Sequence, residues 1–244
     1  MNAKKLARGA ARVSAASVGI GVAAYAAYAA TTWLRYGHVE TSIGVESDSL
    51  LDRFMPTYEI VERHRTYVAA PAAVTLAAAA EMDLQQSRLA RYIFKGRELI
   101  LRSRPDEKPR PRGLIAFSRS LGWGVLAETP SEIVMGAVTQ PWESDVIFRP
   151  LLPEAFASFN DPGYVKIVWT LRADALGDHA SIFRTETRAV ATDAVARLRF
   201  RRYWSFVSPG IVLIRYATLG PLRAEAERRA RELRSRPEVM VGAK

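Results

Sequence analysis

Apolar and polar residues alternate most regularly between positions 165 and 172, where the chain reads VKIVWTLR. A period of two is the pattern of a β-strand that buries one face. The run SIFRTETRAVA (181–191) follows after the short segment ALGDHA and also alternates, with charged residues at 184, 186 and 188 on one face. We therefore expect two antiparallel strands joined by a turn. The apolar face of the first run consists of Val165, Ile167, Trp169 and Leu171.

Other short runs are rich in β-branched or aromatic residues, which favour strands. They are YEIVERHRTYVA (58–69), WGVLAE (123–128) and EIVMGAVTQ (132–140). The tripeptide TPS separates the last two, which makes them a candidate hairpin. Residues 142–150 are a further candidate strand, and the sequence NDPG at 160–163 is a strong turn signal.

Helices are expected at three places. Pro71 fits the first turn of a helix that continues through AAVTLAAAAEMD. A second helix is expected at 87–101, followed by RPDEKPRPRG, whose three prolines indicate a surface connection. The pair Thr-Asp at 192–193 can cap a long C-terminal helix, which should break or kink at Ser-Pro-Gly, 208–210.

The predicted order is thus one strand, two helices, a series of antiparallel strands and a long C-terminal helix. Segregation of strands and helices indicates an α+β fold, with helices packed on one face of a curved sheet. We assign this domain to residues 58–234 and a tail to 235–244.

The start of the chain has a different pattern. Residues 13–34 carry no charge over 22 positions, and four basic residues precede them within 1–12. A bilayer core needs about 20 apolar residues, so we expect a transmembrane helix at 13–34 and a linker at 35–57. Because basic flanks stay in the cytoplasm, the N-terminus should be cytoplasmic and the domain should lie outside, at a bacterial cell membrane.

Two other interpretations of this segment stay open. Ala27-Tyr28-Ala29 resembles the small-x-small site of a cleaved signal peptide, although the apolar run is longer than is usual for one. The abundance of alanine also fits an ordinary helix of a soluble domain.

The formal net charge of +10 lies mainly at the two ends of the chain. Residues 195–244 hold 12 basic and 4 acidic side chains. We find neither a basic face interleaved with aromatic residues nor a known nucleic-acid module. We therefore expect no nucleic-acid partner, and anionic lipid headgroups explain the basic ends at least as well. The apolar run IVLIRYATLGPL (211–222) either covers the mouth of a cavity or touches the membrane.

The stretch DPGYVKIVWTLRADALGDHASIFRTETRAVATD, leading into ARLRFRRYW, resembles a pattern in bacterial members of the START-like, or SRPBCC, superfamily. The residues that carry the resemblance are Glu186, Thr187, Arg188, Asp193, Phe200, Tyr203 and Trp204. The superfamily includes polyketide cyclase/dehydrase-like and lipid-transport proteins. The resemblance covers about residues 58–234 and implies a helix-grip fold, in which an antiparallel sheet wraps around a long C-terminal helix. It also implies an internal cavity that binds an apolar small molecule or lipid.

Candidate residues for the wall of that cavity are aromatic residues, together with hydroxyls that could orient a ligand. They are Trp123, Trp169, Phe183, Thr185, Thr187, Tyr203, Trp204 and Phe206. Ordinary core packing is the alternative for the aromatic residues.

Little in the sequence indicates catalysis. Cysteine is absent, and the three histidines, His38, His64 and His179, lack metal-ligand spacing, so we expect no metal, no cofactor and no catalytic residue. Glu186 would be a general base only if it faced the cavity, since burial would raise its pKa. A charged row with Arg184 and Arg188 is the alternative. We therefore expect a membrane-anchored domain that binds a hydrophobic molecule; a cyclase- or dehydratase-like enzyme and a structural partner of an envelope complex stay open.

Overall fold

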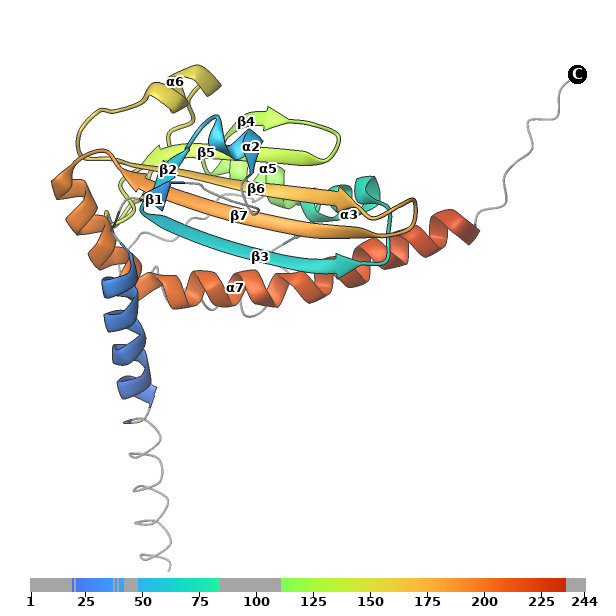
Figure 1. Cartoon of the computed structure of the whole chain (residues 1–244), viewed down its shortest axis with the longest axis horizontal. Helices are drawn as coiled ribbons and strands as arrows, with labels where there is room; N and C mark the ends of the chain where they lie inside the picture. The colour runs from blue at the N-terminus through green and yellow to red at the C-terminus, as the bar shows by residue number, and fades with distance from the viewer. Residues whose placement is uncertain are drawn as a thin grey trace, which may run out of the picture.

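The computed structural model describes residues 19, 21–36, 38, 40–41, 48–83 and 111–235. Within them the centre of the fold is an antiparallel five-stranded sheet in the order β3-β7-β6-β5-β4. The first strand of this sheet, β3, lies beside the last, β7. From β7 the other strands follow in reverse chain order to β4 at the far edge. With the long C-terminal helix this is the helix-grip arrangement, so the α+β fold class is confirmed (Figure 1).

The strands of the main sheet are β3 (Ile60–Val68), β4 (Gly124–Glu128), β5 (Glu132–Thr139), β6 (Val165–Ala175) and β7 (Ser181–Ala191). A small second sheet pairs β1 (Glu40–Thr41) with β2 (Thr57–Tyr58). The helices with defined bounds are α2 (Ser49–Asp52), α3 (Ala72–Ala80), α5 (Leu114–Ser120), α6 (Pro153–Ser158) and α7 (Ala194–Ser235).

One side of the sheet, which we call the inner face, packs against α3, α5 and the C-terminal half of α7. Trp169 of β6 and Phe183 of β7 are buried there with Leu76 of α3 and with Leu222 and Ala226 of α7. In Figure 1, α7 runs along the edge of the sheet formed by β3. The alternation in the sequence predicted which residues of β6 and β7 share this face, and the packing of Trp169, Leu171 and Phe183 in one cluster agrees with it.

The opposite side, the outer face, is covered in part by α2 and α6. Leu51 of α2 and Phe156 of α6 are fully buried and pack in a cluster with Val134 and Val168 of the sheet. Residues 48–57, which the sequence pattern placed in a linker, are therefore part of the folded domain. Burial of such apolar side chains stabilises a fold by about 1.5–3 kcal/mol each, which explains why this short segment settles on the sheet.

The long helix α7 begins as the sequence predicted. Oδ1 of Asp193 accepts hydrogen bonds from the amides of Val195 and Ala196 at 2.7 and 3.0 Å, so Asp193 caps the helix. Figure 1 shows that the first part of α7 lies at an angle to the rest. The helix continues through Pro209, whose ring crowds the preceding turn and which has no amide hydrogen to donate. The expected interruption at 208–210 is thus a bend within one helix.

Two elements predicted from the sequence are not seen in the described structure. Residues 142–150 do not form a strand, because the chain turns after β5, with the amide of Glu143 donating to the carbonyl of Gln140 at 3.1 Å. A single bridge pairs Val138 with Arg149. The predicted helix at 87–101 lies outside the described residues.

The N-terminal segment is helical from residue 21 to 35. This helix packs against the first part of α7, where Nε of Arg201 donates to the carbonyl of Trp33 at 2.6 Å. Among the residues that the structure describes, no helix combines the length and the apolar character needed to cross a bilayer. Residues 13–18 of the predicted transmembrane run lie outside that part of the chain.

Candidate functional site

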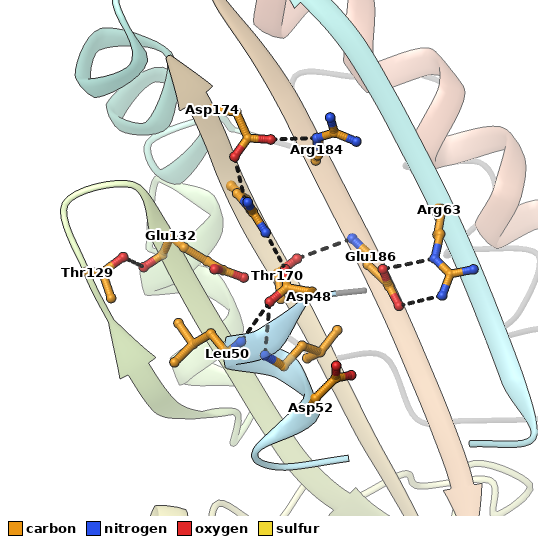
Figure 2. A network of polar contacts seen from close by, with 12 residues as sticks. Asp48, Leu50, Asp52, Arg63, Thr129, Glu132, Thr170, Asp174, Arg184 and Glu186 are labelled. Atoms are coloured by element: carbon orange, nitrogen blue, oxygen red, sulfur yellow. Dashed lines mark hydrogen bonds and ion pairs between the residues drawn. The ribbon is translucent and has the colours of Figure 1, made fainter. Parts of the chain in front are cut away.

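The outer face of the sheet carries a network of charged side chains (Figure 2). Glu186 of β7 accepts two hydrogen bonds from Arg63 of β3, at 3.0 and 3.2 Å. Farther along the strands, Asp174 accepts at 2.6 Å from both Arg172 and Arg184. Each of these carboxylates is therefore held by an arginine of a neighbouring strand, and Asp174 is held also by Arg172 of its own strand.

Arg188 is the most buried member of this network, with none of its side chain exposed. Its Nε donates to Glu186 at 2.6 Å, and its Nη1 donates to the carbonyl of Met55 at 2.8 Å and to the carboxylate of Asp52. Its guanidinium also lies 4.8 Å from the ring centre of Tyr58. Because Asp52 and Met55 belong to α2 and the turn after it, Arg188 fixes this segment to the sheet.

A groove with a volume of about 340 Å³ opens beside this network. Its lining residues are Asp48, Arg63, His64, Arg65, Thr170, Arg172, Asp174, Arg184, Thr185 and Glu186. Arg65 lies directly opposite Arg184, which lies opposite Arg172 in the next strand. Like charges in such a row repel, and the carboxylate of Asp174 offsets the repulsion for two of the three. The groove is thus suited to a small polar or anionic molecule.

Glu132 of β5 lies buried next to Asp48 and Arg172. Burial, and then a hydrogen bond with the carboxylate of Asp48, raise the pKa of Glu132 to about 8. Asp48 is itself fixed, because it caps α2 by accepting from the amides of Leu50 and Leu51 at 3.1 and 3.0 Å. Glu132 therefore keeps its proton at neutral pH.

A second polar cluster lies on the inner face. Arg215 of α7 donates to the hydroxyl of Thr185 at 2.6 Å and to that of Thr187. Tyr36, just after the N-terminal helix, donates its hydroxyl to the carboxylate of Glu62 in β3. Burial lowers the pKa of Arg215 to about 10, against an opposing effect of Glu62, so the guanidinium stays charged at neutral pH. The inner face thus holds a half-buried cation.

His64 of β3 lies beside this cation. It is paired across the strands with Thr185, is 6% exposed, and meets the ring of Tyr216 edge-on at 4.7 Å. Burial, and then the charge of Arg215, lower the pKa of His64, so its ring is neutral at pH 7. Within the described part of the chain, neither ring nitrogen has a hydrogen-bond partner. One donor and one acceptor are therefore buried and unused.

Five of the eight predicted cavity residues lie in this region. They are Trp123, Trp169, Phe183, Thr185 and Thr187. The ring of Trp123 stacks on Phe148 at 4.9 Å and meets Trp169 edge-on at 6.0 Å. Thr187 lies directly opposite Trp169 in the neighbouring strand. The structure thus brings the aromatic candidates and the hydroxyl candidates together on one face of the sheet.

The other three candidates lie in the first part of α7, in a different cluster. Trp204 is buried and meets Tyr36 edge-on at 6.2 Å, whereas Tyr203 stacks on Phe200 at 6.3 Å. The side chain of Phe206 is exposed. The bend in α7 separates these residues from the part of the helix that packs on Trp169 and Phe183.

Glu186 lies on the outer face, away from α7, between Arg63 and Arg188. Glu186 therefore belongs to a charged row on the outer face. It does not face α7, so it is not a general base in a cavity beneath that helix. The sequence did not indicate that Glu62, His64 and Arg215 form a polar cluster on the inner face. Glu62 and His64 alternate with arginines in an edge strand, and Arg215 lies in an apolar run. Across the described ranges, no group of three or more acidic or histidine side chains could hold a metal ion.

No family model matches the chain, and no curated protein matches it. A comparison with solved structures finds the Zhui aromatase/cyclase from Streptomyces sp. R1128 at 16% identity. The match covers 70% of this chain and 94% of that chain, with a TM-score of 0.24. The helix-grip assignment therefore rests on the strand order and the long C-terminal helix of the chain itself.

Proposed function

We propose that this helix-grip domain binds an apolar small molecule or lipid between the inner face and α7, with the polar end of the ligand at His64 and Arg215. The observation that carries the proposal is that neither ring nitrogen of His64 finds a hydrogen-bond partner among the described residues. A buried polar group without a partner costs about 1–3 kcal/mol, so its presence calls for a partner. A ligand oxygen would accept from one nitrogen or donate to the other.

The surroundings of His64 support an amphipathic ligand. Arg215 supplies a positive charge for a carboxylate or another polar end group. Trp169, directly opposite Thr187, begins the apolar part of the same face. Removal of a hydrocarbon chain from water contributes about 0.8 kcal/mol for each CH₂ group, so the apolar part would provide affinity and the polar end would set orientation.

The test is to measure the affinity of the purified full chain for a fluorescent fatty-acid analogue. Replacing Arg215 with methionine is expected to weaken binding about tenfold or more, because a hydrogen bond to a charged group contributes about 1.5–3 kcal/mol. Arg231→Met is the matched control, since Arg231 is exposed near the end of α7. Equal affinities for both variants, with unchanged folding, would contradict the proposal.

An enzyme acting on such a ligand is a second candidate, favoured by the contact between Tyr36 and Glu62. A carboxylate, a phenol and a neutral imidazole on one face are the groups that proton-transfer chemistry uses. A ligand recovered unchanged after prolonged incubation with the full chain would exclude this second candidate and leave the binding function intact.

We also propose that residues 13–34 anchor the chain in a bacterial cell membrane, with the N-terminus in the cytoplasm. The uncharged run and the basic residues before it support this arrangement. Intact-mass measurement of the mature protein should give the full chain, and extraction at alkaline pH should leave it in the membrane. A mass lacking the first 29 or so residues would indicate a cleaved signal peptide, and release by alkali would indicate a peripheral protein.

A further inference from the structure

One side of α7 carries large apolar side chains that are about half exposed or more in the described structure, although the ring of Tyr216 also meets His64 of β3. They are Val195, Leu198, Phe206, Leu213 and Tyr216, each between 49% and 62% exposed. We call this set the α7 stripe. Isolated exposed apolar residues are common on proteins, but a continuous set on one element marks a surface that contacts something else.

The stripe follows the period of the helix. At 100° per residue, its five members fall within an arc of about 80° around the helix axis. Val195, Leu198 and Phe206 lie before Pro209, and Leu213 and Tyr216 lie after it, so the stripe occurs on both arms of the bent helix. The opposite side of α7 packs on the sheet through Phe200 and Leu222. One face of α7 thus packs on the domain, and the other is largely exposed, with contacts at Tyr216 and at the backbone of Phe206.

The charge of this part of α7 identifies the kind of partner. Residues 194–224 contain six arginines and no acidic residue. Arg199 and Arg202 are exposed and fall on the same side of the helix as the stripe. An exposed apolar stripe with only positive charges beside it is the pattern of a helix that lies in the headgroup layer of an anionic bilayer.

The stripe is also continuous with the apolar N-terminal helix. The hydroxyl of Tyr25 donates to the carbonyl of Phe206, and the guanidinium of Arg201 lies 4.5 Å from the ring centre of Trp33. Figure 1 shows the N-terminal helix meeting α7 at its bend. Val22 and Leu34 of that helix are exposed as well. Tyr25 lies near the middle of residues 13–34, so a membrane that received this run would also take in the part of the stripe at Phe206.

We infer that the α7 stripe inserts through the headgroup layer into an anionic membrane, so that the bilayer supports the helix that closes the inner face. The inference rests on the proposed anchor but identifies a separate contact. In this arrangement a lipid would pass between the bilayer and the inner face without crossing water.

Because the chain has no cysteine, the test uses single cysteines in the full chain. Leu213→Cys and Phe206→Cys, each carrying an environment-sensitive fluorophore, are reconstituted into phosphatidylcholine vesicles with or without phosphatidylglycerol. We expect a blue shift of the emission, and quenching by brominated lipids, in the anionic vesicles. Leu152→Cys, at the start of α6 on the outer face, is the control and should keep its aqueous emission.

A second pair of variants tests the charge. Arg199→Gln together with Arg202→Gln should raise the phosphatidylglycerol content needed for half of the shift on the order of tenfold, whereas Arg65→Gln, on the outer face, should not change it. Aqueous emission at Leu213 in a chain that stays with the vesicles would overturn the inference and leave the anchor intact. A blue shift in detergent that grows with protein concentration would overturn it in favour of a second copy of the chain.

Discussion

Replacing Arg188 with alanine is expected to lower the free energy of unfolding by about 3–5 kcal/mol, as measured by urea denaturation at neutral pH. Arg188 is fully buried and neutralises Glu186 and Asp52 while donating to the carbonyl of Met55. Its removal takes the buried cation away from Asp52 and from Glu186, which keeps only the hydrogen bonds from the more exposed Arg63. It also detaches α2, so the exposed surface near Leu51 should increase.

The control for this variant is Arg65→Ala. Arg65 lies on the same face in the neighbouring strand but is exposed, so its loss should change stability by no more than about 0.5 kcal/mol. Equal effects of the two variants would mean that Arg188 is not the link between α2 and the sheet.

The second large effect concerns pH. The folded-state pKa of Glu132 is raised to about 8 by burial and by Asp48, while its unfolded-state value is about 4.3. Between these values the folded chain holds a proton that the unfolded chain releases. The contribution of Glu132 to stability is therefore fully present below about pH 4.3 and is lost as the pH rises toward 8, with a slope of at most about 1.4 kcal/mol per pH unit.

Glu132→Gln should remove this loss, because glutamine keeps the shape and the hydrogen-bond donor without the ionisation. We expect the variant to be more stable than the unmodified chain at pH 8 and close to it at pH 4. Glu154→Gln, at an exposed position of α6, should leave the pH profile unchanged. A parallel profile for Glu132→Gln and the unmodified chain, measured by thermal unfolding across pH 4 to 8, would show that Glu132 ionises normally.

The sequence contained enough to predict the sheet. The alternation in β6 and β7 predicted the two faces, and Asp193 marked the start of α7. These features depend on local periodicity and capping, which a sequence shows directly. The short helix α2 was missed because its four residues carry no periodic pattern, and its position depends on burial of Leu51 and on the ion pair between Arg188 and Asp52.

Local periodicity also indicated which residues of β7 share a face at the candidate site, but it did not indicate their partners. The face of β7 that carries Thr185 and Thr187 follows from alternation, but the contact with Arg215 joins residues 28 and 30 positions apart. Likewise, Phe206 and Trp169 are both apolar, and only the bend in α7 and the exposure of Phe206 distinguish them. Long-range contacts of this kind depend on tertiary packing, which local pattern does not encode.

Native mass spectrometry of the full chain, purified in a mild detergent, shows whether a ligand is bound beneath α7. We expect a population with the added mass of one amphipathic molecule, which decreases in Arg215→Met and persists in Arg231→Met. A chain that carries no added mass, and that gains none when incubated with long-chain fatty acids or phospholipids, would contradict a binding site beneath α7.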